Sequence, residues 1–306
     1  MDEWPTPDWA ASLDVGALAS ATEVLGAVPT AGELCAVEAA LAQVAEGLDA
    51  GAVADAVDAT TPRALLASLG RGPLLALRWS PPGEVSTVHH HAWTVFRPLL
   101  GSTVFERWAA ASPPGPELRS ADLVIEGRSV RIADGELHRQ VTGPDGSIEL
   151  VAIGDYSGAR PRVDVEAHPA AAARADLIHA FVQAYQRADA DAVAALCAED
   201  VLADVNVPLW RFQQQGRAAL ADGLRTGEFA PDHRVTWWRA SPTGDGAVVE
   251  LECHMTHEGE ERLSRQLHRL RCDEHGLVDE HTIYCTGIWT RETIEQHARS
   301  APLIRP

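Results

Sequence analysis

The spacing of hydrophobic positions changes twice along the chain. Apolar residues recur at helical spacing over residues 30–48, which predicts a helix there. We expect two shorter helices over residues 52–57 and 62–69, the latter opened by Pro62, because proline is favoured in the first turn of a helix. From residue 74 to residue 156, short β-type runs alternate with turn sequences such as PPG and GPDG. Many short strands at close spacing indicate a β-sandwich or a small barrel.

The second half has a different pattern. We expect helices over residues 171–188 and 189–198, a strand with PLW (208–210), and a helix over residues 217–226. Four strands joined by hairpin turns follow, over residues 233–241, 247–257, 262–272 and 277–289, and then a last helix over residues 290–299. Helices followed by an antiparallel meander make this half α+β. We therefore predict two domains, residues 1–168 and residues 169–306.

Composition narrows the classes of function. The 306 residues carry a formal charge of −19, and every basic residue is an arginine. The acidic balance argues against binding to nucleic acid or to an anionic membrane, since both need a basic face. The absence of lysine excludes Schiff-base chemistry and a P-loop lysine. The five scattered cysteines, the lack of a basic and apolar leader, and the lack of an apolar run of about 18 residues predict a cytoplasmic protein with reduced thiols.

A histidine run is the part of the sequence richest in candidate chemistry. The segment GEVSTVHHH ends in His89, His90 and His91. In a strand, alternate side chains share a face, so His89 and His91 point one way and His90 the other. His138, in the segment DGELHR, is a third candidate ligand for a metal ion. The alternative is that the run lies on an exposed loop or strand edge.

Residues 72–156 resemble the cupin superfamily and, within it, the cysteine dioxygenase-like thiol dioxygenases. The first cupin motif is met from Gly83 to His91 with a closing glycine at Gly101, and the metal histidine of the second motif matches His138. The phrases LRWSPPGEVSTVHHH and DGELHR are similar to that family's ligand segments. The resemblance implies an all-β cupin (a double-stranded β-helix) preceded by helices, with a metal ion held by His89, His91 and His138.

The same resemblance implies further site residues and a cofactor. Arg63 matches the arginine that binds the substrate carboxylate, and Tyr156 falls where the family has its active-site tyrosine. Val95 and Phe96 stand where most cupins have a glutamate ligand, and Glu106 is too far along to replace it, so the site is expected to be three-histidine. The family's Ser-x-His-x-Tyr relay keeps only its tyrosine here. Fe(II) is the expected cofactor and dioxygen the expected co-substrate, because iron can pass an electron to dioxygen and zinc cannot.

Residues 171–299 resemble the SnoaL-like branch of the NTF2-like superfamily, through AFVQAYQRADADAVAALCAEDVLADVNVPLW, QGRAALADGL and HTIYCTGIW. The resemblance implies an α+β cone around a pocket and, by analogy of fold, a homodimer. Candidate pocket groups are Asp204, Trp210, Trp237, His254, His268 and His281. Strand alternation places His254 with Glu250 and Glu252, which favours an outward polar face for it. Either His254 or His268 has the chemistry of a general base near neutral pH.

Three hypotheses follow. The first is an enzyme of specialised metabolism, a mononuclear non-haem iron oxygenase acting on a small molecule that bears a carboxylate and in some cases a thiol. The second is a SnoaL-like cyclase, isomerase or dehydratase in the second half, with a structural or ligand-binding cupin. The third is a binding or assembly module whose cupin has lost its chemistry. Loss of activity on metal chelation is expected of the first alone.

Overall fold

The computed structural model describes residues 4–25, 28–69, 73–110, 115–154, 163–208, 210–230, 232–257 and 259–300. The chain divides into two compact units, the first comprising residues 1–117 and 122–168 and the second residues 118–121 and 169–306. Both contain helices and mostly antiparallel strands. Within the described residues, none of the helices combines the length and the apolar character that a membrane span requires.

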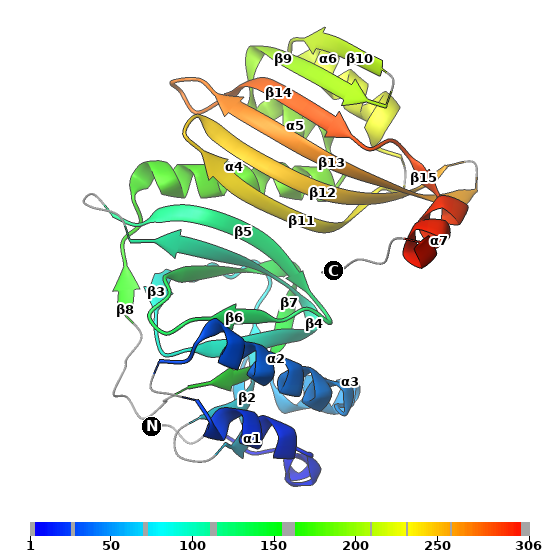
Figure 1. Cartoon of the computed structure of the whole chain (residues 1–306). Coiled ribbons are helices and arrows are strands. Elements are labelled where there is room, and N and C mark those ends of the chain that lie inside the picture. The colour runs from blue at the N-terminus through cyan, green and yellow to red at the C-terminus, as the bar shows by residue number, and fades with distance from the viewer. Residues whose placement is uncertain are drawn as a thin grey trace. The chain divides into compact units, whose positions relative to one another are not determined.

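The first unit opens with helices and continues with strands (Figure 1). Its helices are a 3₁₀ turn (Asp8–Ser12), α1 (Gly16–Glu23), α2 (Ala31–Glu46) and α3 (Ala50–Ala56). Its strands are β1 (Arg63–Ser68), β2 (Leu74–Ser80), β3 (Val88–His90), β4 (Thr94–Ala109), β5 (Glu117–Ile125), β6 (Val130–Ile132), β7 (His138–Ile153) and β8 (Val163–Val165). The strand order is β1-β2-β7-β4-β5, with β3 paired to β7 and β8, and β6 paired to β4.

Helix α2 forms where the apolar spacing predicts it. Thr30 and Glu33 form a capping box at its start, in which the threonine side chain accepts from the Glu33 backbone and the glutamate accepts from the Thr30 backbone. Its buried stripe packs with leucines of β2 and β7 in one core. The sheet that carries the histidines is therefore supported from one side by a helix whose ends are well defined.

The predicted helix over residues 62–69 is wrong, because this segment forms strand β1. Its burial alternates along the strand, with Ala64 and Leu66 buried, and it pairs antiparallel with β2. A short apolar run does not distinguish helix from strand by itself, and pairing with β2 decides the outcome. Arg63 consequently lies at the start of a strand and not on a helix.

Several runs expected to be separate strands are continuous. β4 extends through Gly101 and β7 through Gly146, with register shifts where the two strands face each other. Both glycines have positive φ, +75° and +80°, which lets each strand bend without ending. The antiparallel β character of the first unit agrees with the sequence pattern, while the double-stranded β-helix of a cupin stays a prediction.

The second unit is α+β, as its pattern predicts. Its helices are α4 (Pro169–Gln186), α5 (Ala190–Ala195), α6 (Arg217–Gly223) followed by a π-helical turn (Leu224–Glu228), and α7 (Arg291–Ser300). Its strands are β9 (Cys197–Val207), β10 (Trp210–Gln215), β11 (Arg234–Thr243), β12 (Gly246–His257), β13 (Glu260–Cys272), β14 (Val278–Cys285) and β15 (Trp289–Thr290). The strand order is β11-β12-β13-β14-β9-β10, and β14 runs parallel to β9.

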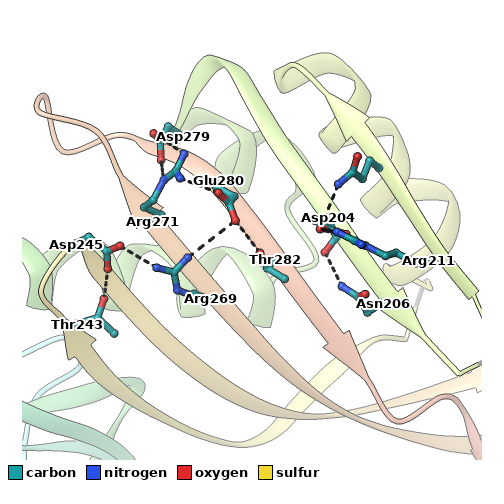
Figure 2. Close-up of polar contacts among 11 residues, drawn as sticks. Asp204, Asn206, Arg211, Thr243, Asp245, Arg269, Arg271, Asp279, Glu280 and Thr282 are labelled. Carbon is teal, nitrogen blue, oxygen red and sulfur yellow. Dashed lines mark hydrogen bonds and ion pairs between the residues drawn. The ribbon is translucent and has the colours of Figure 1, made fainter.

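The sheet of the second unit is curved, with α4, α5 and α6 gathered on one side of it (Figure 1). Asp189 caps α5, its side chain accepting from the backbone N–H of Ala192. The opposite face of the sheet carries ion pairs, among them Arg269 with Asp245 and Arg271 with Asp279 (Figure 2). Because successive side chains in a strand point to opposite faces, one face of this sheet packs against the helices and the other carries the ion pairs.

Candidate metal centre and a second polar interior

The structure brings the three predicted histidines of the first unit together. One ligand atom from each of His89, His91 and His138 lies within 4.8 Å of the others. His89 pairs with His138 across β3 and β7, and His91 directly follows β3. His89 and His138 are 4% and 1% exposed, so the cluster is not a surface run of histidines.

Backbone carbonyls orient all three imidazole rings. The Nδ1 atoms of His89, His91 and His138 lie 2.7, 2.5 and 2.9 Å from the carbonyl oxygens of Thr87, Ala92 and Glu136 respectively. A carbonyl accepts, so each Nδ1 carries the proton and each Nε2 keeps a lone pair. This tautomer is the one in which imidazole binds a metal ion through Nε2 while a hydrogen bond at Nδ1 holds the ring in place.

The electrostatic environment keeps His138 neutral. Burial, reinforced by the adjacent His89 ring, lowers the pKa of His138 to about 2. A metal ligand must be deprotonated, so this environment favours the binding form at neutral pH. Three neutral imidazoles without a carboxylate fit a divalent transition-metal ion, which would keep its full charge for an anionic ligand.

The side chain of Glu106, the nearest acid downstream of His91, binds other side chains and not the histidine cluster. Its fully buried carboxylate accepts two hydrogen bonds from Arg139 and one from Trp108. This arrangement agrees with the expectation that Glu106 is not a ligand of the histidine centre.

A pocket of about 760 Å³ adjoins the histidines. It is lined by residues that include His89, Arg63, Arg78, Gln140 and Trp79. Arg63 is exposed, and its guanidinium carbon lies 5.4 Å from the centre of the Trp4 ring. The structure thus places Arg63 on the same pocket as a metal-ligand candidate. Tyr156, the other predicted catalytic residue, lies outside the described residues.

Sequence reasoning missed Arg78, Gln140 and Glu149. Arg78 donates to the Gln140 side-chain carbonyl at 2.6 Å and is ion-paired with Glu149, whose side chain is fully buried. A signal was present, because Gln140 lies two residues after His138 and shares its face of the strand.

The second unit has a polar interior built on β13 and β14. Ser264, Gln266 and His268 of β13 are buried on one face of the sheet. His281 of the neighbouring strand β14 is buried on the same face. His268 Nε2 lies 2.8 Å from Gln266 Oε1, and His268 Nδ1 lies 2.9 Å from His281 Nε2. Because the amide oxygen accepts, His268 carries its proton on Nε2 and accepts from the Nε2–H of His281.

One ring nitrogen of His281 takes no part in this chain of hydrogen bonds. His281 Nδ1 is buried and has no hydrogen-bond partner among the described residues. Burial lowers the pKa of His281 to about 4 and that of His268 well below its usual range. Both rings are therefore neutral at pH 7, and Phe181 and Tyr185 of α4 pack against them.

The remaining candidate pocket groups of the second unit lie elsewhere. Asp204 is bound by Arg211 and Gln213 (Figure 2), and Arg211 lowers the pKa of that carboxyl. Trp210 is 71% exposed. Trp237 pairs with Glu252 on the outer face, and the buried tryptophan is its neighbour Trp238.

His254 lies on the outer face as its alternation predicts. It contacts the carboxylates of Glu252 and Glu261. His268 and His281 are thus the two predicted groups of the second unit that face its interior.

Comparison with known proteins identifies part of the second unit. Residues 178–281 match the SnoaL-like domain family. This segment is SnoaL-like. The match agrees with the NTF2-like α+β fold expected for the second half and does not extend to the first unit, where the cupin resemblance stays a prediction. No curated protein matches the chain.

Solved structures similar to the chain align with a little over a third of it. A putative polyketide cyclase from Xanthomonas campestris pv. campestris is 24% identical, covers 37% of this chain and 90% of its own, and has a TM-score of 0.32. One from Pseudomonas putida KT2440 is 21% identical over 40% and 96%, with a TM-score of 0.32. SalBIII, described as an epoxide hydrolase/cyclase-like enzyme in pyran ring formation in salinomycin, is 17% identical over 38% and 95%, with a TM-score of 0.32.

Proposed function

We propose that the chain is an enzyme acting on a small molecule, with a divalent metal ion held by His89, His91 and His138 in the first unit. The observation that carries this proposal is the common orientation of the three rings, each with Nδ1 against a backbone carbonyl. Three side chains from two segments share this arrangement, as ligands of one ion require and as a chance cluster does not.

The finer proposal is a mononuclear non-haem iron oxygenase. Bound Fe(II) would supply one-electron chemistry towards dioxygen. The chain itself would hold the substrate, because Arg63 lines the adjoining pocket and an arginine binds a carboxylate through two parallel hydrogen bonds. Tyr156 is proposed, on the resemblance alone, as a hydrogen-bond donor to the reacting groups.

Metal analysis of protein purified without a histidine tag tests the metal centre. Wild-type protein is expected to hold about one transition-metal ion per chain, mainly iron. His138→Ala is expected to lose the metal, because two imidazoles do not retain it. His90→Ala is the matched control, since His90 belongs to the same run and lies outside the cluster. Equal metal content in His138→Ala and wild type refutes the centre, and a stoichiometric zinc content refutes the oxygenase.

A second candidate function places catalysis in the second unit. In it the SnoaL-like segment is a cyclase, isomerase or dehydratase, and the first unit is structural or binds a ligand. The family match supports this candidate better than the oxygenase, because it covers the second unit alone. The neutral, buried pair of His268 and His281 gives this unit a hydrogen-bond acceptor at His281 Nδ1, which is the form of imidazole that takes a proton from a ligand.

Chelation separates the two candidates. Turnover by the second unit is expected to survive removal of metal and to fall at least about a hundredfold in His281→Gln, the lower range for loss of a general base. His254→Gln is the control, since His254 lies on the outer face of the same sheet. Turnover that is lost with the metal and unchanged in His281→Gln overturns this second candidate.

A further inference from the structure

A row of polar side chains runs along the inner face of β13 and continues onto β14. Ser264, Gln266 and His268 alternate along β13, so their buried side chains share one face of the sheet. His281 and Cys285 of β14 adjoin this row, the first through His268 and the second through Ser264. Two imidazoles, an amide, a hydroxyl and a thiol are thus joined from end to end by hydrogen bonds.

The two histidine rings cannot be protonated independently of each other. Both are fully buried and neutral at neutral pH, because burial lowers their pKa values, with His281 as a further cause at His268. A neutral imidazole has one N–H and one acceptor nitrogen. Since His268 Nδ1 lies 2.9 Å from His281 Nε2, one of these atoms donates and the other accepts. Either both rings carry the proton on Nε2, or both carry it on Nδ1.

Gln266 selects between these two states. Its Oε1 lies 2.8 Å from His268 Nε2, within the usual range for an N–H···O hydrogen bond. An amide oxygen only accepts, so Nε2 of His268 carries the proton. In the other state two acceptor atoms would face each other at this distance. The selected state makes His281 Nδ1 an acceptor, whatever lies beside that atom.

The orientation of the Gln266 amide is supported from its other end. Its Nε2 donates to the Ser264 hydroxyl at 3.4 Å, and that hydroxyl lies 3.1 Å from Cys285 Sγ. The sulfur accepts from the backbone N–H of Gly287 at 3.2 Å, and a backbone N–H can only donate. With the serine hydrogen directed to this sulfur, every donor in the row points from His281 towards Cys285.

We propose that Gln266 is a positioning residue of the second unit. Its amide oxygen fixes the tautomer of His268 and, through it, that of His281, so that Nδ1 of His281 meets a ligand as a hydrogen-bond acceptor. The ligand atom at Nδ1 must therefore carry a hydrogen, as a hydroxyl group or an acidic C–H does. This inference rests on the second candidate function, in which His281 takes a proton, and adds the residue that sets its tautomer.

NMR of the full-length protein labelled with ¹⁵N-histidine tests the proposal at neutral pH. The N–H nitrogen and the bare nitrogen of a neutral imidazole have well-separated ¹⁵N chemical shifts, so the spectrum reports the tautomer directly. The variants His268→Gln and His281→Gln assign the resonances. In wild type both rings are expected to have a protonated Nε2 and a bare Nδ1. A protonated Nδ1 on either ring overturns the proposal.

Gln266→Leu removes the acceptor. The ratio of the Nδ1–H form to the Nε2–H form of His281 is expected to rise at least about fivefold, the factor that one net hydrogen bond supplies. Gln183→Leu, on the exposed face of α4, is the control and is expected to keep the wild-type ratio. An unchanged ratio in Gln266→Leu overturns the proposal.

Gln266→Glu tests the same role by rescue. At alkaline pH it is expected to keep the wild-type ratio, because an ionised carboxylate also accepts and does not donate. If Gln266→Leu folds poorly, the wild-type spectrum and this variant decide, and a rise in the Nδ1–H form in Gln266→Glu counts against the proposal.

The spectra are recorded without substrate, so their outcome is independent of the second candidate function. Unchanged turnover in His281→Gln refutes that function and leaves the tautomers to be decided by NMR. A protonated Nδ1 on His281 refutes the role of Gln266 even where turnover requires His281.

Discussion

At the scale of single residues, the two units use buried histidine differently. In the first unit, backbone carbonyls at Nδ1 leave a lone pair on every Nε2, and one ligand atom of each ring lies within 4.8 Å of the others. In the second unit, His268 and His281 bind each other, and Gln266 accepts from His268 and donates to the Ser264 hydroxyl. The first arrangement suits ligation of a cation, and the second suits a neutral acceptor.

Burial of His281 makes stability dependent on pH. Its pKa is lowered to about 4 in the folded protein, whereas an unfolded chain has a histidine pKa of about 6.5. The unfolded state therefore binds the proton first, so the stabilisation is fully present above about pH 6.5 and is lost as the pH falls towards 4. Urea unfolding at about pH 7.5 and about pH 5 is expected to show a loss of about 2 kcal/mol from this group, since about 1.5 pH units of the window lie above pH 5.

His281→Gln is expected to reduce that loss, since the glutamine side chain does not titrate. His275→Gln is the control, because His275 is exposed in the turn before β14. A pH dependence as steep in His281→Gln as in wild type would show that other groups cause it.

At the scale of elements, glycines set the bend between β4 and β7. Gly101 has a φ of +75°, and a Cβ there would lie 2.1 Å from the carbonyl oxygen of Gly146. Gly83 has a similar φ of +68° with no atom within 4 Å of an added Cβ. The two positions share the backbone strain and differ in the space available.

Alanine variants at Gly83 and Gly101, compared with each other, test the role of Gly101 in that bend. Gly83→Ala is expected to lower the free energy of unfolding by about 1 kcal/mol, the cost of a left-handed conformation. Gly101→Ala adds a backbone clash and is expected to cost about 3 kcal/mol or more. Chemical denaturation of both variants measures the difference, and equal losses would contradict the bend as described.

Elements with strong local signals are predictable, and short apolar runs are not. The capping box of α2 and the aspartate cap of α5 are each formed by residues three apart in the sequence. Local spacing therefore locates the start of both helices. The segment 63–68 has an apolar run compatible with either structure, and its partners in β2 lie six to 15 residues away in the chain. Long-range pairing decides such segments.

At the scale of the whole molecule, the two units carry separate candidate sites. The chain has a formal charge of −19, and the pocket of the first unit nevertheless includes Arg63 and Arg78 in its lining. We expect the protein to be a homodimer, because NTF2-like folds commonly pair through their sheets. Sedimentation analysis is expected to give twice the chain mass of 32.8 kDa, and a monomer at all concentrations tested would contradict this expectation.

Sequence spacing alone determined that His89 and His91 share a face and that the second half is α+β, because alternation and helical period are local properties of the chain. It also singled out His138 by motif. Only the tertiary structure decided that His138 meets the other two histidines, that Arg78 and Gln140 face the pocket, and that His281 rather than Asp204 lies inside the second unit. These outcomes depend on which strands pair and in which register, and pairing joins residues whose separation in the chain carries no local signal.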